Sequence, residues 1–178
     1  MLQTTGLNYP AIIVKDMQES IEFYQRLGLV HLYTEPNRDD PESITAMLYA
    51  GGNDTFVQLV GPVEPGAVKI AEASPGIGSM QYLSFTVTQE QMQGMFHEMS
   101  NAGVRGSEEI VRGFERLVFM EDPNGVLITL VAWSIEPPPG VSRRRVLERA
   151  AAIREAEGHA FIEDTHLQQA IEALRGTE

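Results

Sequence analysis

The apolar and polar positions of the first third of the chain follow the order strand, helix and three strands. The apolar run 11–14 predicts a strand, and Asp16 and Glu19 then have the spacing of an N-terminal capping box. Four apolar residues recur at helical spacing before Gly28, which predicts the end of the helix: Met17, Ile21, Tyr24 and Leu27. Three more strands are predicted at residues 30–34, 45–49 and 55–60, the last two joined by a Gly51-Gly52-Asn53-Asp54 turn.

The same order of elements recurs after a stretch with Pro and Gly from Gly61 to Met80. Residues 81–87 predict a strand, and Thr88 with Gln91 forms a second capping box. The next helix has a buried face that ends before Gly103 and consists of Met92, Met95, Phe96 and Met99. Strands follow at 109–113, 116–120 and 126–133, the last two joined by the turn Asp122-Pro123-Asn124-Gly125.

The two passes align with each other. Val14 before the first helix corresponds to Val87 before the second, and residues 58–60 correspond to 129–131. This predicts an α+β fold in which two βαβββ modules, residues 7–62 and 80–134 of a domain 1–134, pair into a curved eight-stranded cleft. Such a duplication predicts a binding site shared by both modules.

Residues 135–178 are expected to form a linker and a C-terminal helical extension. The Pro-rich segment 135–140 predicts a stiff linker. Val146, Ala150 and Ile153 suit one amphipathic helix, and Asp164 or Thr165 is the predicted cap of a second. Arg143-Arg144-Arg145 lies near a helix start, where cations are disfavoured, so these arginines are expected either to pair with acidic groups or to lie in solvent. The helices are too short to hold a core alone, and the sequence leaves open whether they form a lid or a dimer contact.

Composition narrows the classes of function. A net charge of −12 argues against nucleic acid as a partner. It indicates either a solvated surface or attraction of a cationic ligand. The absence of cysteine excludes disulfides and thiolate chemistry. No leader-like start or membrane-spanning run is seen, so we expect a cytoplasmic protein without membrane contact.

With both modules laid out, residues 7–134 resemble the vicinal-oxygen-chelate superfamily of glyoxalases, bleomycin-resistance proteins and extradiol dioxygenases. The resemblance rests on two stretches, in order and with duplicated spacing: residues 14–16 leading into 22–29, and Asp122-Pro123-Asn124-Gly125 followed by residues 126–130. It implies metal ligands at equivalent strand positions of the two modules, which here are Tyr9, Gln58, Tyr82 and Thr129. None of these is His, Asp or Glu, so the expectation is a member without a metal or other cofactor.

The four histidines do not restore a metal site in this reading. His31 lies in a predicted strand, His97 on the second helix, and His159 and His166 in the tail, all away from the family's ligand positions. His159, Glu163 and His166 have suggestive spacing, but the expected helix cap at Asp164 or Thr165 interrupts a common face. The sequence therefore predicts no metal ligand among them.

Two hypotheses follow. The first is a metal-independent binding protein of the bleomycin-resistance type, expected to be a homodimer, that holds an aromatic or cationic compound through Tyr9, Gln58, Tyr82 and Thr129. The second is a metal-free lyase, isomerase or cyclase in which Tyr9 or Tyr82 transfers a proton and Arg112 or Arg116 steadies an oxyanion. A metal-dependent glyoxalase- or dioxygenase-like enzyme is a third, less favoured reading. Alternatively, the tyrosines only fill the space of a former metal centre.

Overall fold

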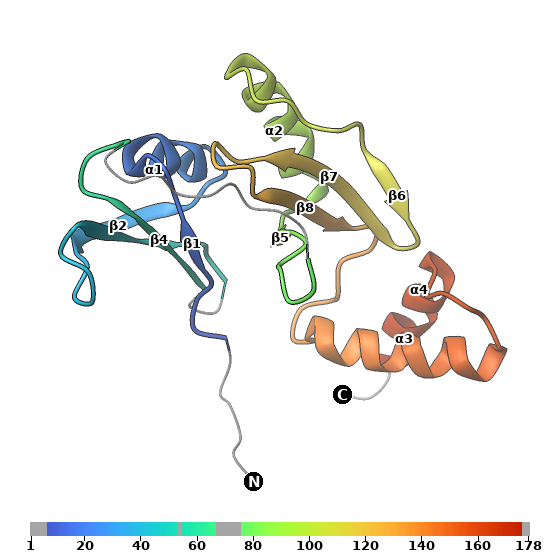
Figure 1. The fold of residues 1–178 in the computed structure, drawn as a ribbon. Helices are drawn as coiled ribbons and strands as arrows, with labels where there is room; N and C mark the ends of the chain where they lie inside the picture. Colours follow the sequence, from blue (N-terminus) through green and yellow to red (C-terminus); the bar gives the residue numbers. More distant parts are fainter. Residues whose placement is uncertain (1–6, 53–54, 67–75, 176–178) are drawn as a thin grey trace, which may run out of the picture. The chain divides into compact units, whose positions relative to one another are not determined.

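The computed structural model describes residues 7–52, 55–66 and 76–175. It contains twelve elements in this order (Figure 1): β1 (Ala11–Ile13), α1 (Met17–Arg26), β2 (Val30–Pro36), β3 (Ser43–Tyr49), β4 (Phe56–Pro62), β5 (Leu83–Thr86), α2 (Gln89–Asn101), β6 (Ile110–Arg112), β7 (Glu115–Glu121), β8 (Leu127–Trp133), α3 (Arg143–Glu157) and α4 (Asp164–Arg175). The chain divides into two compact units, the first comprising residues 1–83, 98–105 and 121–128, and the second the remainder.

Duplication is confirmed at the level of single hydrogen bonds. The sheets have the orders β1-β4-β3-β2 and β5-β8-β7-β6, which are the same order one module apart. Val14 N donates to Val60 O at 2.8 Å, and the equivalent Val87 N donates to Val131 O at 3.0 Å. The predicted α+β architecture of two βαβββ modules is therefore correct.

The first sheet buries one face, and on the other, called here the open face, the β1 side chains are exposed and Gln58 of β4 is half-buried. Ile12 and Val14 of the β1 segment are buried, whereas Ile13 between them is 64% exposed. Gly61 of β4 is required by close packing on this buried side, because a Cβ there would lie 2.9 Å from Val14 Cγ2. Buried side chains of α1, Ile21 and Tyr24 among them, supply further apolar surface to the same core.

Both predicted helix starts are confirmed. Asp16 caps α1 by accepting from Glu19 N at 3.0 Å. Thr88 and Gln91 form a complete capping box before α2, with Gln91 N donating to Thr88 Oγ1 at 3.1 Å and Thr88 N donating to Gln91 Oε1 at 2.8 Å. The predicted turn residues Asn53 and Asp54, much of the 61–80 stretch and the side chain of Phe96 lie outside what the structure describes.

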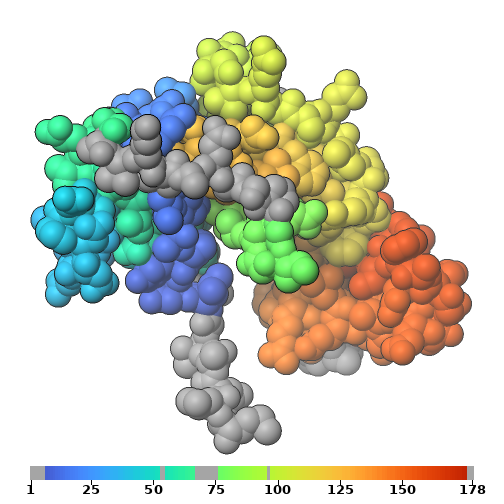
Figure 2. Space-filling model, in the orientation of Figure 1, coloured from blue at the N-terminus to red at the C-terminus, as the bar shows by residue number. Residues whose placement is uncertain are grey.

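The C-terminal helices form a hairpin that shares a core with the second sheet. Figure 2 shows α3 and α4 (orange to red) gathered in one lobe. Trp133 of β8 is buried in one cluster with residues of both helices, namely Val146, Ala150, Leu167, Ala170 and Ile171, and Val131 packs against that cluster. Arg143 reinforces this contact, since its Cζ lies 4.6 Å from the Trp133 ring centroid. The extension is therefore an integral part of the second unit.

Two expectations about this tail resolve differently. The predicted α4 cap is wrong by one residue, because His166 N and Leu167 N both donate to Glu163 O, which makes Glu163 the cap in place of Asp164 or Thr165. Both alternatives left open for the arginine cluster occur: Arg143 pairs with Glu136 and Arg144 with Glu148, both at 2.8 Å, and the Arg144 side chain is at the same time 83% exposed. Among the described residues, no helix is long and apolar enough to cross a membrane.

Candidate functional site

Tyr9 and Gln58 lie on the open face of the first sheet. Gln58 is the register partner of Ala11 in the parallel β1–β4 pair, and Gln58 N donates to Pro10 O at 3.0 Å. Tyr9 lies two residues before Ala11, so alternation along the extended backbone places it on the same face as Ala11 and Gln58. Tyr9 is 37% exposed and Gln58 is half-buried. The alternation thus assigns these two predicted residues to one sheet face, with Tyr9 just before β1 and Gln58 on β4.

Tyr82 and Thr129 occupy the equivalent places in the second module, but Thr129 has different surroundings. Tyr82 is half-buried just before β5. Thr129 lies in β8 and has no exposed surface. Its alternate neighbours Val131 and Trp133 share its face and contact the α3–α4 cluster. The C-terminal hairpin therefore packs on the strand face that corresponds to the open face of Gln58.

These four side chains do not fit a divalent metal. They offer two phenols, an amide and a hydroxyl, all of which are neutral donors, whereas hard and borderline cations are held by carboxylates and imidazoles. Thr129 Oγ1 is buried and has no hydrogen-bond partner among the described residues. Within the part of the chain that the structure describes, no second group orients it as a ligand, in contrast to the hydrogen-bonded ligands of metal centres.

The arginines proposed for oxyanion binding are engaged with carboxylates. Arg116 lies 3.8 Å from Glu109 and 3.9 Å from Asp164, and it donates to Gly113 O at 3.4 Å. Arg112 forms an ion pair with Glu115 at 3.1 Å. Because nearby carboxylates compensate both guanidinium charges, neither arginine is prepared for a developing negative charge.

The turn that carried the family resemblance has a structural role. Asp122 is buried and accepts from Asn124 N and Val126 N, both at 2.8 Å, and from Tyr24 Oη at 3.1 Å. Asn124 in turn donates to Ser20 Oγ at 3.0 Å and accepts from Lys15 N at 2.9 Å. Burial, and then the charge of Asp122 and the hydrogen bond to it, raises the pKa of Tyr24 above its usual value. This network fastens the turn to α1.

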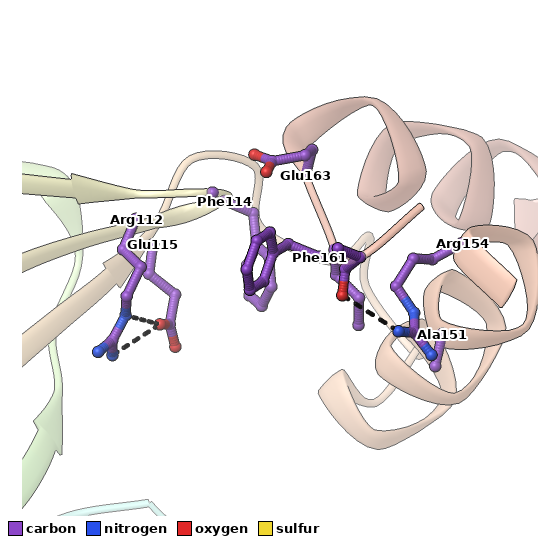
Figure 3. A pocket seen from close by; sticks show the side chains of 10 residues that line it. Arg112, Phe114, Glu115, Ala151, Arg154, Phe161 and Glu163 are labelled. Carbon is purple, nitrogen blue, oxygen red and sulfur yellow. Dashed lines mark hydrogen bonds and ion pairs between the residues drawn. The ribbon is translucent and has the colours of Figure 1, made fainter. Parts of the chain in front are cut away.

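A pocket of about 490 Å³ lies in the second unit, between the β6–β7 hairpin and the α3–α4 connection. Figure 3 shows Phe114 and Phe161 in its centre, with Arg112 and Glu115 on one side and Arg154 on the other. Phe161 is 75% exposed, and Arg154 donates to Ala160 O at 3.2 Å. None of the four predicted site residues lines this pocket.

The structure also brings together a cluster that sequence reasoning missed. Glu157 at the end of α3, His159 just after it and His166 in the first turn of α4 converge. His159 Nδ1 lies 2.8 Å from His166 Nε2, and Glu157 Oε2 lies 3.1 Å from that same nitrogen. The sequence search grouped the histidines with Glu163. Gly158, which ends α3, was the sequence signal that could have placed Glu157 beside the histidines.

Comparison with known proteins agrees with this fold. A family model described as Glyoxalase/Bleomycin resistance protein/Dioxygenase superfamily matches residues 6–130. A search of curated protein sequences gives no match.

Several solved structures are similar in fold. A glyoxylase/bleomycin resistance protein/dioxygenase domain from Frankia sp. EAN1pec has a TM-score of 0.60 at 16% identity, covering 78% of this chain and 96% of that chain. A glyoxalase family protein from Bacillus cereus gives 0.58 at 17% identity, covering 74% and 96%. A variant of the fosfomycin resistance protein FosX from Listeria monocytogenes, complexed with Mn(II) and a dihydroxypropylphosphonic acid, gives 0.55 at 17% identity, covering 73% and 94%. At these identities the likeness establishes the fold alone.

Proposed function

Because the chain belongs to the glyoxalase, bleomycin-resistance protein and dioxygenase superfamily, we propose that it binds an aromatic or cationic small molecule, without a metal at the binding site and without chemistry. The observation that carries this proposal is the pair Tyr9 and Gln58 on the open face of the first sheet. A partly exposed aromatic ring and a neutral amide assigned to one sheet face suit stacking and one hydrogen bond. Tyr82 and Thr129 are the corresponding candidates in the second module.

Charge supports the cationic side of this ligand class. The net charge of −12 raises the local concentration of cations at the surface and disfavours anions. The neutral donors at the family's ligand positions support independence from metal. The FosX variant structure, by contrast, contains Mn(II). We therefore expect no metal-dependent reaction with a phosphonate such as fosfomycin.

The alternative of a metal-free lyase, isomerase or cyclase has less support. It requires a cation that lowers the pKa of a catalytic tyrosine or receives an oxyanion. Arg116 and Arg112 both pair with carboxylates within their own unit. Binding without chemistry is therefore the preferred reading.

A ligand screen with matched variants tests the proposal. We would measure binding of planar aromatic cations by calorimetry in EDTA, with wild type, Tyr9→Phe, Tyr9→Ala and Tyr33→Ala. Tyr33 is the control because it is also a substantially exposed tyrosine, at 47%, on β2 of the same sheet. A stacking role predicts that Tyr9→Ala lowers affinity about fivefold or more, since cation–π contacts contribute about 1 kcal/mol. Tyr9→Phe should keep most of the affinity.

Two outcomes would overturn the proposal. Loss of binding in EDTA would show that the site needs a metal. Equal affinities for wild type and Tyr9→Ala would remove Tyr9 from the site. Turnover of a bound compound by wild type that is lost in Tyr9→Phe would instead favour the metal-free enzyme.

A cytoplasmic location and a homodimer are further parts of the proposal. Light scattering of the full chain measures the mass, and a monomeric mass at micromolar concentration would contradict the dimer. Fractionation of the cells that produce the protein tests the location.

A further inference from the structure

The side chains of Glu157, His159 and His166 are held in place by two helix ends. Gly158 ends α3 with a left-handed φ of 73°, and His159 N donates to Arg154 O at 3.0 Å. This closing turn fixes the direction of the chain after Glu157. At the other helix, Glu163 is the cap of α4 and Glu163 N donates to His166 Nδ1 at 2.9 Å. His166 thus takes the place that Glu or Gln has in a capping box.

Three potential ligand atoms lie close to one another. The separation of His159 Nδ1 and His166 Nε2 is 2.8 Å, and Glu157 Oε2 lies 3.1 Å from the latter and 3.3 Å from the former. Bonds of about 2.0–2.2 Å in a tetrahedral zinc site place ligand atoms roughly 3.3 Å apart. The three separations therefore lie within about 0.5 Å of that arrangement. His166 is 1% exposed, whereas His159 and Glu157 are 59% and 39% exposed, so the position is accessible from solvent on one side.

The composition of the cluster also suits such an ion. Two imidazoles and one carboxylate are the donors that zinc and its neighbours in the first transition row prefer. Neutral imidazole is the form that coordinates a metal.

The tautomer of His166 differs between the free and the metal-bound states. Because Nδ1 accepts from Glu163 N, a neutral ring carries its proton on Nε2, between His159 and Glu157. A metal on Nε2 moves this proton to Nδ1, which can then no longer accept. Coordination therefore replaces one capping hydrogen bond with a metal bond, and the Glu163 amide reports the change.

We propose that Glu157, His159 and His166 bind one divalent ion of the zinc class, with water in the remaining coordination position. This site lies in the C-terminal extension, beyond the family match at residues 6–130 and away from the family's ligand positions. It would fasten α3 to α4, which form the hairpin that packs on β8. The proposal does not depend on the ligand-binding function.

Calorimetry of the full chain with ZnCl₂, and with MgCl₂ as the comparison, tests the site. Wild type and His97→Ala, which removes an exposed histidine on α2, should bind one zinc with equal affinity. His159→Ala and Glu157→Gln should each lower the affinity at least about 100-fold, because even an outer-sphere change costs 10–100-fold. Magnesium should not bind at these imidazoles.

His166 is buried, so its own replacement, His166→Ala, is expected to destabilise the helix pair. Two structural readouts test its role without that variant. Zinc should raise the melting temperature of wild type and His97→Ala but not of His159→Ala, which removes a mostly exposed side chain. It should also speed hydrogen exchange of the Glu163 amide. No stoichiometric zinc binding, or binding that survives His159→Ala, would overturn the proposal, and an unchanged Glu163 amide would exclude His166 Nε2 as a ligand. Ligand binding that depends on Tyr9 would be unaffected by any of these results.

Discussion

The hydrogen bond between Tyr24 and Asp122 should couple two segments that lie far apart in the sequence, and a double-mutant cycle measures that coupling. Asp122 accepts four hydrogen bonds, from Tyr24 Oη, Asn124 N, Asn124 Nδ2 and Val126 N. Asp122→Asn keeps an oxygen for the two backbone donors. It places an amide where Tyr24 and Asn124 donate, so the Asn124 Nδ2 bond is lost and the Tyr24 bond becomes neutral.

The magnitude follows from these bonds. A hydrogen bond to a charged group contributes about 1.5–3 kcal/mol and a neutral one about 1 kcal/mol. We therefore expect Asp122→Asn to lower the free energy of unfolding by about 2–3 kcal/mol and Tyr24→Phe by about 1–2 kcal/mol. The double variant should lose about 1 kcal/mol less than the two effects combined, because Asp122→Asn already weakens the bond that Tyr24→Phe removes.

Urea unfolding followed by far-UV circular dichroism measures these values, provided that the slope m is shared by all four proteins. Phe23→Leu, tested in place of Tyr24→Phe, serves as the control, since Phe23 is a buried neighbour of Tyr24 whose side chain has no polar atom to bond Asp122. Additive effects of Tyr24→Phe and Asp122→Asn, within about 0.3–0.5 kcal/mol, would refute the reasoning.

Three more predictions concern single side chains. The raised pKa of Tyr24 means that stability is retained up to the unfolded tyrosine pKa of about 10 and falls above it, by at most about 1.4 kcal/mol per pH unit; Tyr24→Phe should reduce this slope in alkaline urea titrations. Thr129→Val removes a buried hydroxyl without a partner among the described residues, so the melting temperature should rise by about 2–4 °C, and a lower value would indicate that the hydroxyl is satisfied. Gly113→Ala should lower the free energy of unfolding by at least about 2 kcal/mol and speed proteolysis of the tail, because the new Cβ would lie 2.6 Å from Ile162 O at a φ of 57°. A proteolysis rate equal to that of wild type would contradict this contact.

The sequence predicted the features that depend on local chemistry or on the repeat. The Thr88–Gln91 box is defined by two residues three apart, and the structure contains both of its hydrogen bonds. The correspondence of Val14 with Val87 predicted equivalent strand pairing, which the structure confirms. Such features need only short-range preferences or comparison of one module with the other.

Features that depend on contacts between distant segments were not predictable. Nothing near Asp122 indicates that its carboxylate accepts from Tyr24, 98 residues earlier. The cluster of Glu157 with the histidines depends on the Gly158 turn and on Glu163 as the cap, and placing that cap one residue too late hid it. An error of one residue at a helix end changes which side chains share a face.

The tail makes the two modules unequal, and this inequality bears on ligand binding. Gln58 and Thr129 are equivalent in the repeat, but Gln58 is half-buried on an open sheet face, whereas Thr129 has no exposed surface and shares its strand face with Val131 and Trp133 under the C-terminal hairpin. A duplicated fold alone would give both positions the same access to a ligand. Since Thr129 is fully buried and the hairpin packs on its strand face at Val131 and Trp133, recognition should depend more on Tyr9 and Gln58 than on their counterparts. The extension thus removes the symmetry that the duplication created.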